Sequence, residues 1–197
     1  MKKVLIVGAG GIGSWLAWNL HHLNQHKQIP QLDITFADND SVDTKNLSYQ
    51  LFQKIDLMDN KATVVANKYN FNGLETRIES DSQLKGYDCI VCAVDNSKFR
   101  RLMFNYGDKN STYWIDLRSV GTAVAFYTKH KENTLKKMLE TIPDENSDHL
   151  EGSCQLEFEL ENNIVQCGNR IIASIGAQLI LNWYRGVTNT PGLTYRF

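Results

Sequence analysis

The residues with the clearest chemical potential are glycines near the start of the chain. The run VLIVGAGGIGSWLA (Val4–Ala17) places Gly8, Gly10 and Gly13 in the spacing G-x-G-x-x-G, directly after four apolar residues. Glycines at this spacing let a backbone approach a phosphate closely, and the helix that follows offers free N–H groups and a partial positive charge. We therefore expect Gly8, Gly10, Gly11 and Gly13 to hold the phosphates of a nucleotide.

Polar side chains also follow two later segments that we expect to form strands. Asp38 and Asp40 come after the alternating segment Leu32–Ala37, and Asp95 comes after the apolar run Cys89–Val94. Ligands of open α/β sheets lie at the carboxyl ends of the strands, so these carboxylates are expected to meet the glycine loop in one crevice. Asp38 is placed to hydrogen-bond a ribose hydroxyl, and Asp95 suits Mg²⁺, which prefers oxygen ligands.

Each charged residue also has a simpler structural interpretation. Asp38 fits a turn or a helix cap, and Asp40 fits a turn as well as it fits a second acid beside the nucleotide. Asp95 fits a cap on the helix that follows it. Lys61 lies near the start of an expected helix, where it could reach a polyphosphate or be an ordinary solvated lysine. For Asp38 we favour the ribose role, because of its position in a nucleotide-binding unit.

Apolar periodicity predicts the elements that must position these groups. Helices are expected at about 11–23, 59–71, 129–140 and 169–184, with another beginning after Asp95. Strands are expected at 4–7, 32–37, 76–79, 89–94, 113–117 and 122–127. Strands alternate with helices in the first half and cluster in the second. The sequence therefore predicts an α/β fold with a Rossmann-like, mostly parallel sheet extended by antiparallel strands.

The length of 197 residues fits a single nucleotide-binding domain over 1–197. We expect a Rossmann-like core over 1–128, a mobile insertion over 129–153 and a C-terminal strand and apolar helix over 154–197. The acidic segment Pro143–Gly152 lacks hydrophobic periodicity, which is typical of a mobile loop.

Composition argues against several classes of protein. The formal net charge of −1 gives no overall positive field to recruit nucleic acid or an anionic membrane. Apolar runs are too short to span a bilayer, and the first one breaks at Gly8 before it could form a signal peptide. Cys89 and Cys92 would point to opposite faces of one strand, which argues against a shared zinc ion. Buried thiols in a reducing cytoplasm fit this pattern.

Taken together, these motifs resemble the ThiF/MoeB family of ATP-dependent enzymes, which are related to ubiquitin-activating enzymes. The resemblance runs from Val4 to about Arg101, in the family's order and spacing. Its pieces are Gly8–Ser14, Asp38–Val42, Asn46-Leu47 with Gln50, Lys61-Ala62, and Asp95-Asn96 with Arg100. A nicotinamide enzyme has no reason to carry Asn-Leu-x-x-Gln and then Lys-Ala after its second strand, so the set favours the ATP-dependent family.

The resemblance implies a reaction and a role for each motif. Family members bind ATP and Mg²⁺ and adenylate a carboxylate, typically the C-terminal glycine of a ubiquitin-like or sulfur-carrier protein, here supplied in trans. They usually form homodimers. Such a displacement depends on charge neutralisation and alignment. The resemblance implies that Asn46 and Lys61 contact the triphosphate, that Gln50 steadies their loop, that Asp95 holds Mg²⁺, and that Asn96 belongs to the same site.

One position departs from the family pattern. Where the family reads Asn-Leu-x-Arg-Gln, with the arginine on the phosphates, this chain has Tyr49, which supplies no fixed positive charge. Arg100, Arg101 and Arg118 are candidates to replace that cation. Cys154, after the acidic segment, is either a structural thiol or an acceptor of the activated acyl group or sulfur, a role that needs a lowered thiol pKa.

Two alternatives to a carboxylate-activating enzyme stay open. A plain dinucleotide-binding domain would make the protein an NAD-dependent oxidoreductase that binds NADH in preference to ATP. Loss of the arginine at Tyr49 fits a non-catalytic ATP-binding adaptor, which would bind ATP without exchanging pyrophosphate. The sequence identifies neither the carrier nor the final acceptor.

Overall fold

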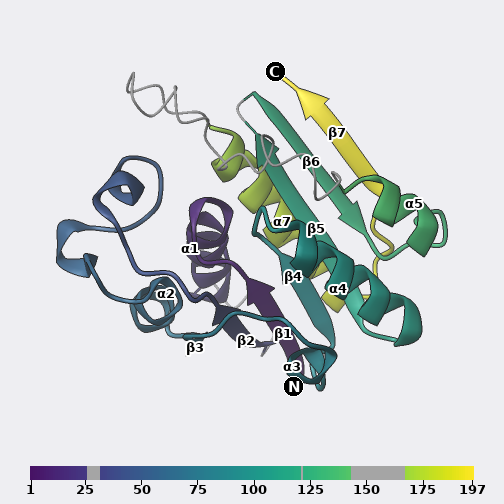
Figure 1. Cartoon of the computed structure of the whole chain (residues 1–197), viewed down its shortest axis with the longest axis horizontal. Helices are drawn as coiled ribbons and strands as arrows, with labels where there is room; N and C mark the ends of the chain where they lie inside the picture. The colour runs from purple at the N-terminus through teal and green to yellow at the C-terminus, as the bar shows by residue number, and fades with distance from the viewer. Residues whose placement is uncertain (26–31, 121, 143–166) are drawn as a thin grey trace.

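A seven-stranded sheet forms the centre of the computed structural model, which describes residues 1–25, 32–120, 122–142 and 167–197 (Figure 1). The strands follow the order β3-β2-β1-β4-β5-β6-β7 across the sheet. Their bounds are β1 Lys2–Val7, β2 Leu32–Ala37, β3 Asn72–Leu74, β4 Cys89–Cys92, β5 Tyr113–Val120, β6 Ala123–Thr128 and β7 Gly192–Arg196. Strands β1 to β5 pair in parallel, and β6 and β7 add antiparallel pairs. The predicted α/β fold is confirmed.

Helices cover both faces of the parallel strands, which explains why these strands are apolar at successive positions. In β1, Val4 and Ile6 belong to one core cluster, and Leu5 and Val7 belong to the other. The first cluster takes side chains from α1 (Gly11–Gln25), α2 (Lys61–Tyr69) and α7 (Gly168–Tyr184). The second takes side chains from α3 (Asp81–Leu84), α4 (Ser97–Lys109) and α5 (Leu135–Glu140).

The two cysteines of β4 lie in different clusters, as their strand spacing predicts. Cys89 packs in the first cluster and Cys92 in the second, and neither thiol is exposed. Burial raises the pKa of Cys92 to about 12, and it raises the pKa of Cys89 even further. Both groups therefore behave as small apolar side chains at neutral pH.

Helix α7 joins the two halves of the molecule by packing on α1 and on the antiparallel side of the sheet (Figure 1). Gly176 allows the close approach, because a methyl group there would lie 2.6 Å from Leu117 Cδ1 in β5. The helix ends at Tyr184, and Gly186 then adopts a φ of +72°. This end of the helix agrees with the stop that Gly186 predicts.

The expected strand over 76–79 is wrong. The third strand is β3, at Asn72–Leu74, and residues 76–79 form an irregular loop. Side-chain hydrogen bonds replace the ladder here: Gln83 Nε2 donates to Arg77 O, and Gln83 Oε1 accepts from the backbone of Glu79. A glutamine that satisfies the backbone in this way removes the need for strand pairing.

Two further expectations about the second half need correction. Only Leu135–Glu140 of the segment 129–140 is helical. Before this helix the chain turns, and the side chain of Asn133 donates to the backbone oxygens of Thr128 and Pro191. The edge strand β7 was not predicted, although its alternating apolar residues were a signal.

Some sequence predictions fall outside the described residues. These are the acidic segment Pro143–Gly152, the part of the proposed insertion beyond 142, Cys154 and the strand expected before the C-terminal helix. Within the described ranges, no helix is both long enough and apolar enough to cross a bilayer.

Candidate nucleotide-binding site

Two adjoining cavities lie at the carboxyl ends of β1, β2 and β4. The first, here the glycine-loop cavity, has a volume of about 280 Å³ and is lined by Gly8, Gly10, Gly11, Asp38, Asp40, Lys45, Asn46, Tyr49, Gln50, Lys61, Ala93, Val94 and Asp95. The second, here the flanking cavity, has a volume of about 180 Å³ and shares Asp38, Asp40, Val94 and Asp95 with the first. The crevice that the sequence predicts is therefore present, since topology gathers these side chains at one edge of the sheet.

The glycine loop needs its glycines because it passes close to the end of β4. Gly8 has a φ of +102°, and a methyl group there would lie 2.7 Å from Val94 Cγ1 and 2.8 Å from Ala93 O. A methyl group on Gly13 would collide with the carbonyl oxygen of Gly8. At Gly10 a methyl group would lie 3.6 Å from Gln50 Oε1, which is ordinary van der Waals contact, so no clash requires a glycine there.

Asp38 ties the end of β2 to the glycine loop. Its Oδ2 accepts a hydrogen bond from the backbone N–H of Ala9 at 2.7 Å, and its Oδ1 accepts one from Asp40 at 2.9 Å. The bond to Asp40 is the turn interaction expected from the structural interpretation. The bond to Ala9 fixes the loop, and each carboxylate oxygen keeps a lone pair for a ligand. Burial raises the pKa of Asp38, and the two backbone hydrogen bonds oppose that shift.

The raised pKa of Asp38 and the lowered pKa of Asp43 predict that the two carboxylates change the stability of the protein in opposite directions as the pH falls. A carboxyl with a raised folded-state pKa is destabilising when charged, and that penalty disappears as pH falls through the folded pKa. Wild type should therefore gain stability relative to Asp38→Asn between about pH 7 and pH 4. Asp43 has a lowered pKa, chiefly through the hydrogen bond from Thr44, so its contribution to stability is lost only as pH falls below about 4. Wild type should therefore lose stability relative to Asp43→Asn between about pH 4 and pH 2. Urea denaturation at the ends of each interval measures the differences, and the same direction of change for both carboxylates would contradict the assignment of Asp38.

Lys61 is not an ordinary solvated lysine. It begins α2 with only 8% of its surface exposed, and its Nζ lies 3.2 Å from Asp40 Oδ2. The preceding residue, Asn60, caps the helix by accepting from Thr63 N and also donates to the backbone oxygens of Asp38 and Asp40. The capping residue thus holds the end of β2 against the start of α2, which brings the ammonium group to the glycine-loop cavity.

Asn46, Tyr49 and Gln50 come from the short helix η1 (Thr44–Ser48) and the turn after it. Asn46 Oδ1 accepts from Asp43 N, which leaves its amide nitrogen 3.5 Å from the Tyr49 hydroxyl. Gln50 is 8% exposed, and its Oε1 has no hydrogen-bond partner among the described residues. An unpartnered buried amide oxygen at a cavity wall is a group that a ligand can satisfy.

This turn is anchored to the helix that follows the glycine loop. Trp15 Nε1 donates to Tyr49 O at 3.3 Å, and the Ser14 hydroxyl accepts from Leu51 N at 3.2 Å. Tyr49 itself is 8% exposed, so a buried phenol occupies the place for which the motif predicts an arginine.

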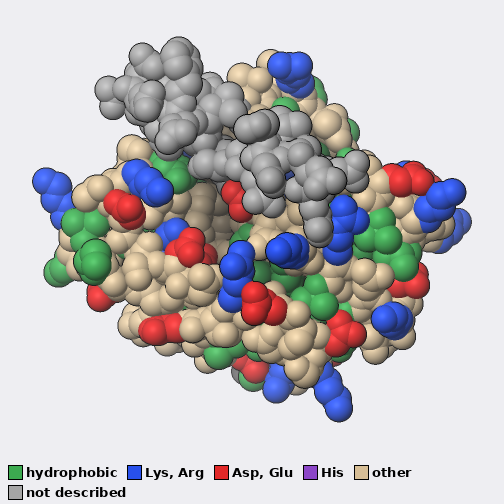
Figure 2. Space-filling view, viewed as in Figure 1, with side chains coloured by type: hydrophobic (Ala, Val, Ile, Leu, Met, Phe, Trp, Pro, Cys, Tyr) green, Lys and Arg blue, Asp and Glu red, His purple; other side chains and the backbone are tan. Residues whose placement is uncertain are grey.

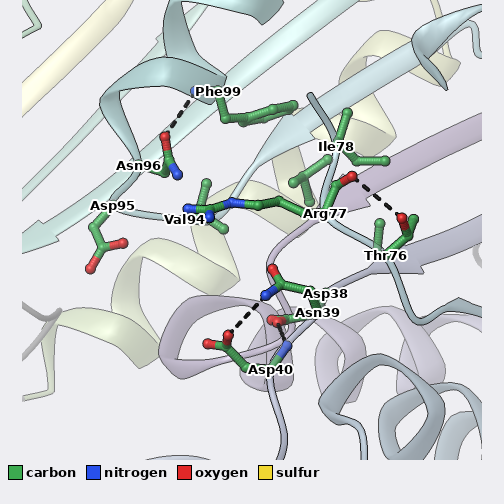
Figure 3. A pocket seen from close by; sticks show the side chains of 12 residues that line it. Asp38, Asn39, Asp40, Thr76, Arg77, Ile78, Val94, Asp95, Asn96 and Phe99 are labelled. Atoms are coloured by element: carbon green, nitrogen blue, oxygen red, sulfur yellow. Dashed lines mark hydrogen bonds between the residues drawn. The ribbon is translucent and has the colours of Figure 1, made fainter. Parts of the chain in front are cut away.

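Two polar residues, Asp95 and Asn96, lie in the turn between β4 and α4 and have different structural roles. Asn96 Oδ1 accepts from Phe99 N at 3.1 Å, so Asn96 caps the helix and the capping interpretation of Asp95 is wrong. Asp95 is exposed and lines both cavities. Within the described residues its carboxylate oxygens make no hydrogen bond, which leaves them for a ligand. Figure 3 shows both side chains at the edge of the flanking cavity.

The arginines proposed to replace the missing cation have other partners. Arg100 is buried: its Nε lies 3.1 Å from Asp116 Oδ1, and its terminal nitrogens donate to the backbone oxygens of Val94 and Asp95. Arg118 Nη2 lies 2.7 Å from Asp116 Oδ2, on the other side of the same carboxylate. Arg101 lines neither cavity. Replacement of the cation by these residues is therefore not supported, because the fold uses Arg100 and Arg118 to neutralise Asp116.

Two cations that the sequence analysis missed line the cavities instead. Lys45 lines the glycine-loop cavity and Arg77 lines the flanking cavity. Neither belongs to a motif: Lys45 lies in the short helix η1, and Arg77 lies in the irregular loop over 76–79, where spacing gives no signal. On the face shown in Figure 2, lysines and arginines are interspersed with acidic side chains rather than gathered in one patch.

Comparison with known proteins places the chain in a family. A model of the ThiF family matches residues 1–196. The chain belongs to the ThiF family. Similar solved structures include PaaA, with a TM-score of 0.70 and 16% identity over 100% of this chain and 61% of PaaA. No match was found among curated proteins.

Structures of MccB from E. coli are also similar to this ThiF-family chain. The structure with AMPCPP and MccA has a TM-score of 0.66 and 19% identity over 96% of this chain and 57% of that one. The structure with ATP has a TM-score of 0.64 and 18% identity over 100% of this chain and 60% of that one. At these identities the likeness concerns the fold, and the ThiF-family chain described here spans about three fifths of the length of the proteins it matches.

The charges of the glycine-loop cavity fit a magnesium–phosphate complex. Three carboxylates (Asp38, Asp40 and Asp95) and two lysines (Lys45 and Lys61) line it. Among the described residues, no group of three or more His, Cys, Asp or Glu side chains is placed to hold a metal ion. Mg²⁺ is usually bound by one or two carboxylates together with phosphates and water, so the exposed carboxylate of Asp95 suits that arrangement.

Proposed function

We propose that this ThiF-family chain is an ATP- and Mg²⁺-dependent adenylyltransferase that activates a carboxylate as an acyl-adenylate. The observation that carries the proposal is the meeting of the glycine loop, Asp38, the buried Lys61 and the exposed Asp95 around one cavity. In the reaction a carboxylate oxygen attacks the α-phosphorus of ATP, an oxygen–phosphorus bond forms, and pyrophosphate leaves with the bonding pair. This displacement requires positioning and charge neutralisation, which these groups can provide.

Each residue has a specific part in this proposal. The N–H groups at Gly10, Gly11 and the start of α1 bind phosphate oxygens, and the free lone pairs of Asp38 accept from the ribose hydroxyls. Lys61 approaches the phosphates from α2 with its ammonium group held by Asp40. Asp95 would hold Mg²⁺, which supplies positive charge beside the phosphates when bound.

We further propose that the carboxylate belongs to a second molecule, the C-terminal glycine of a ubiquitin-like or sulfur-carrier protein supplied in trans. The MccB structure that contains MccA together with AMPCPP supports the part of this proposal that a second molecule is supplied in trans. A homodimer in the reducing cytoplasm is part of the same proposal, and so is Cys154 as an acceptor thiol.

A non-catalytic ATP-binding adaptor is the second candidate, and Tyr49 is the observation that favours it. The tyrosine is buried at the cavity wall, and Arg100 and Arg118 are paired with Asp116. An NAD-dependent oxidoreductase has less support, because it leaves Asn46, Gln50 and Lys61 of the glycine-loop cavity without an assigned role.

Isotope exchange separates these three functions. Purified protein is incubated with ATP, Mg²⁺, labelled pyrophosphate and a set of carrier proteins ending in glycine, and label in ATP is counted. Carrier-dependent exchange is expected for the adenylyltransferase. Calorimetry with ATP and with NADH completes the test: ATP binding without exchange by any carrier indicates an adaptor, and binding of NADH alone indicates an oxidoreductase.

A further inference from the structure

The side chain of Arg77 lies across the flanking cavity. Figure 3 shows it extending from the loop that carries Thr76 and Ile78 toward Val94, on the side of the β4–α4 turn. Five of the residues that line this cavity are apolar (Val7, Ala37, Ile78, Val94 and Phe99), and the others besides Arg77 are polar or acidic (Asp38, Asn39, Asp40, Thr76, Asp95 and Asn96). A planar cation therefore faces a cavity that offers both apolar walls and hydrogen-bonding groups, a combination that suits a purine base.

The loop that carries Arg77 is held from this residue to Ser80. Gln83 Nε2 donates to Arg77 O at 3.0 Å, and Gln83 Oε1 accepts from Glu79 N and Ser80 N at 2.9 and 3.1 Å. Ile78, the next residue, is 5% exposed and packs in the second core cluster. These contacts fix the backbone of Arg77 beside the flanking cavity.

In the part of the chain that the structure describes, the Arg77 guanidinium makes one weak ion pair. Its Nε lies 4.0 Å from Glu79 Oε1, and these two side chains are 58% and 72% exposed. An exposed pair at the limit of ion-pair distance contributes little free energy. The guanidinium can therefore meet a ligand without giving up a stable salt bridge.

We propose that Arg77 binds the nucleobase, with its guanidinium plane against one face of the purine. The proposal rests on the proposed function, which places the phosphates at the glycine loop and the ribose at Asp38. Since Asp38 and Asp95 line both cavities, the base of such a nucleotide extends into the flanking cavity. Guanidinium groups stack on aromatic faces more effectively than ammonium groups do, and Arg77 lies beyond the ribose end of the site.

Ligands with and without a base show whether Arg77 contacts the base or the phosphates. Dissociation constants for AMP, ATP and inorganic tripolyphosphate are measured by calorimetry for wild type, Arg77→Met and Arg77→Lys. Arg77→Met keeps most of the aliphatic length, and Arg77→Lys keeps the charge but not the plane. Lys98→Met is the matched control, because Lys98 is an exposed cation of α4 that lies outside the flanking cavity.

We expect Arg77→Met to weaken AMP and ATP binding by the same factor, about fivefold to tenfold, and to leave tripolyphosphate unchanged. For Arg77→Lys, the increase in the logarithm of the dissociation constant should be more than half of that for Arg77→Met. Lys98→Met should bind all three ligands as wild type does. Unchanged nucleotide affinity in Arg77→Met, or a loss that grows from AMP to ATP, would overturn the inference alone. If wild type binds neither nucleotide, the proposed function and this inference fail together.

Discussion

Asp95→Ala is expected to slow ATP–pyrophosphate exchange by about 10²–10³-fold, the range found when one preorganised charge-stabilising group is removed from an active site. The Asp95 carboxylate is exposed to both cavities and accepts no hydrogen bond within the described residues. The fold therefore does not depend on it, and the helix behind it is capped by Asn96. The loss should come from the metal–phosphate complex rather than from unfolding.

Magnesium dependence makes this prediction specific. Asp95→Asn keeps the shape and one oxygen, so its residual exchange should require a higher Mg²⁺ concentration than wild type needs. Asp108→Ala, at the exposed far end of α4, is the matched control and should exchange normally. The free energy of unfolding should change by less than about 0.5 kcal/mol in each variant. Exchange by Asp95→Ala at the wild-type rate would show that the magnesium assignment is wrong.

Asp116→Ala is expected to lower the free energy of unfolding by about 3–5 kcal/mol, because it leaves two cations without their carboxylate. Asp116 has no exposed surface, Arg100 is 8% exposed, and both arginines lie within 3.1 Å of its oxygens. Burial opposes the charge on Arg100, yet the adjacent carboxylate holds the pKa of Arg100 above its ordinary value. Without Asp116, its carboxylate no longer offsets the cost of burying the charge of Arg100, and the folded state is destabilised.

Urea denaturation at neutral pH measures the effect, with Glu79→Ala as control. Glu79 forms an exposed pair with Arg77, so its loss should change stability by less than about 1 kcal/mol. Arg100 also donates to the backbone oxygens of Val94 and Asp95, so folded Asp116→Ala should bind ATP more weakly than wild type. Equal losses of stability in Asp116→Ala and Glu79→Ala would contradict this account of the buried cluster.

The comparison of sequence and structure is clearest at the candidate site. Gly8, Asp38 and Asp95 are separated by thirty residues or more in each case, yet the sequence predicted that they meet. The prediction was possible because parallel strands present their carboxyl ends at one edge of a sheet. The roles of these residues stay proposals, but their convergence is a consequence of topology that periodicity can predict.

The ion pairs of Arg100 and Arg118 with Asp116 could not be predicted from the sequence. Nothing in the spacing of Arg100, Asp116 and Arg118 predicts that one carboxylate takes both guanidiniums. Their pairing depends on α4 packing beside β5, and that is a property of the assembled core. The same reasoning applies to Lys61, whose burial distinguishes it from a solvated helix lysine only once α2 is placed.

The sequence alone determined the alternation of strands and helices, the glycine turn after β1 and the edge of the sheet where polar groups gather, because each follows from local periodicity or backbone sterics. Only the tertiary structure decided that 76–79 is a loop clamped by Gln83, that Arg77 therefore faces a cavity, and that β7 closes the antiparallel edge. These features depend on hydrogen bonds and pairings that form between segments only after the core has brought them together, and a local pattern carries no information about such partners.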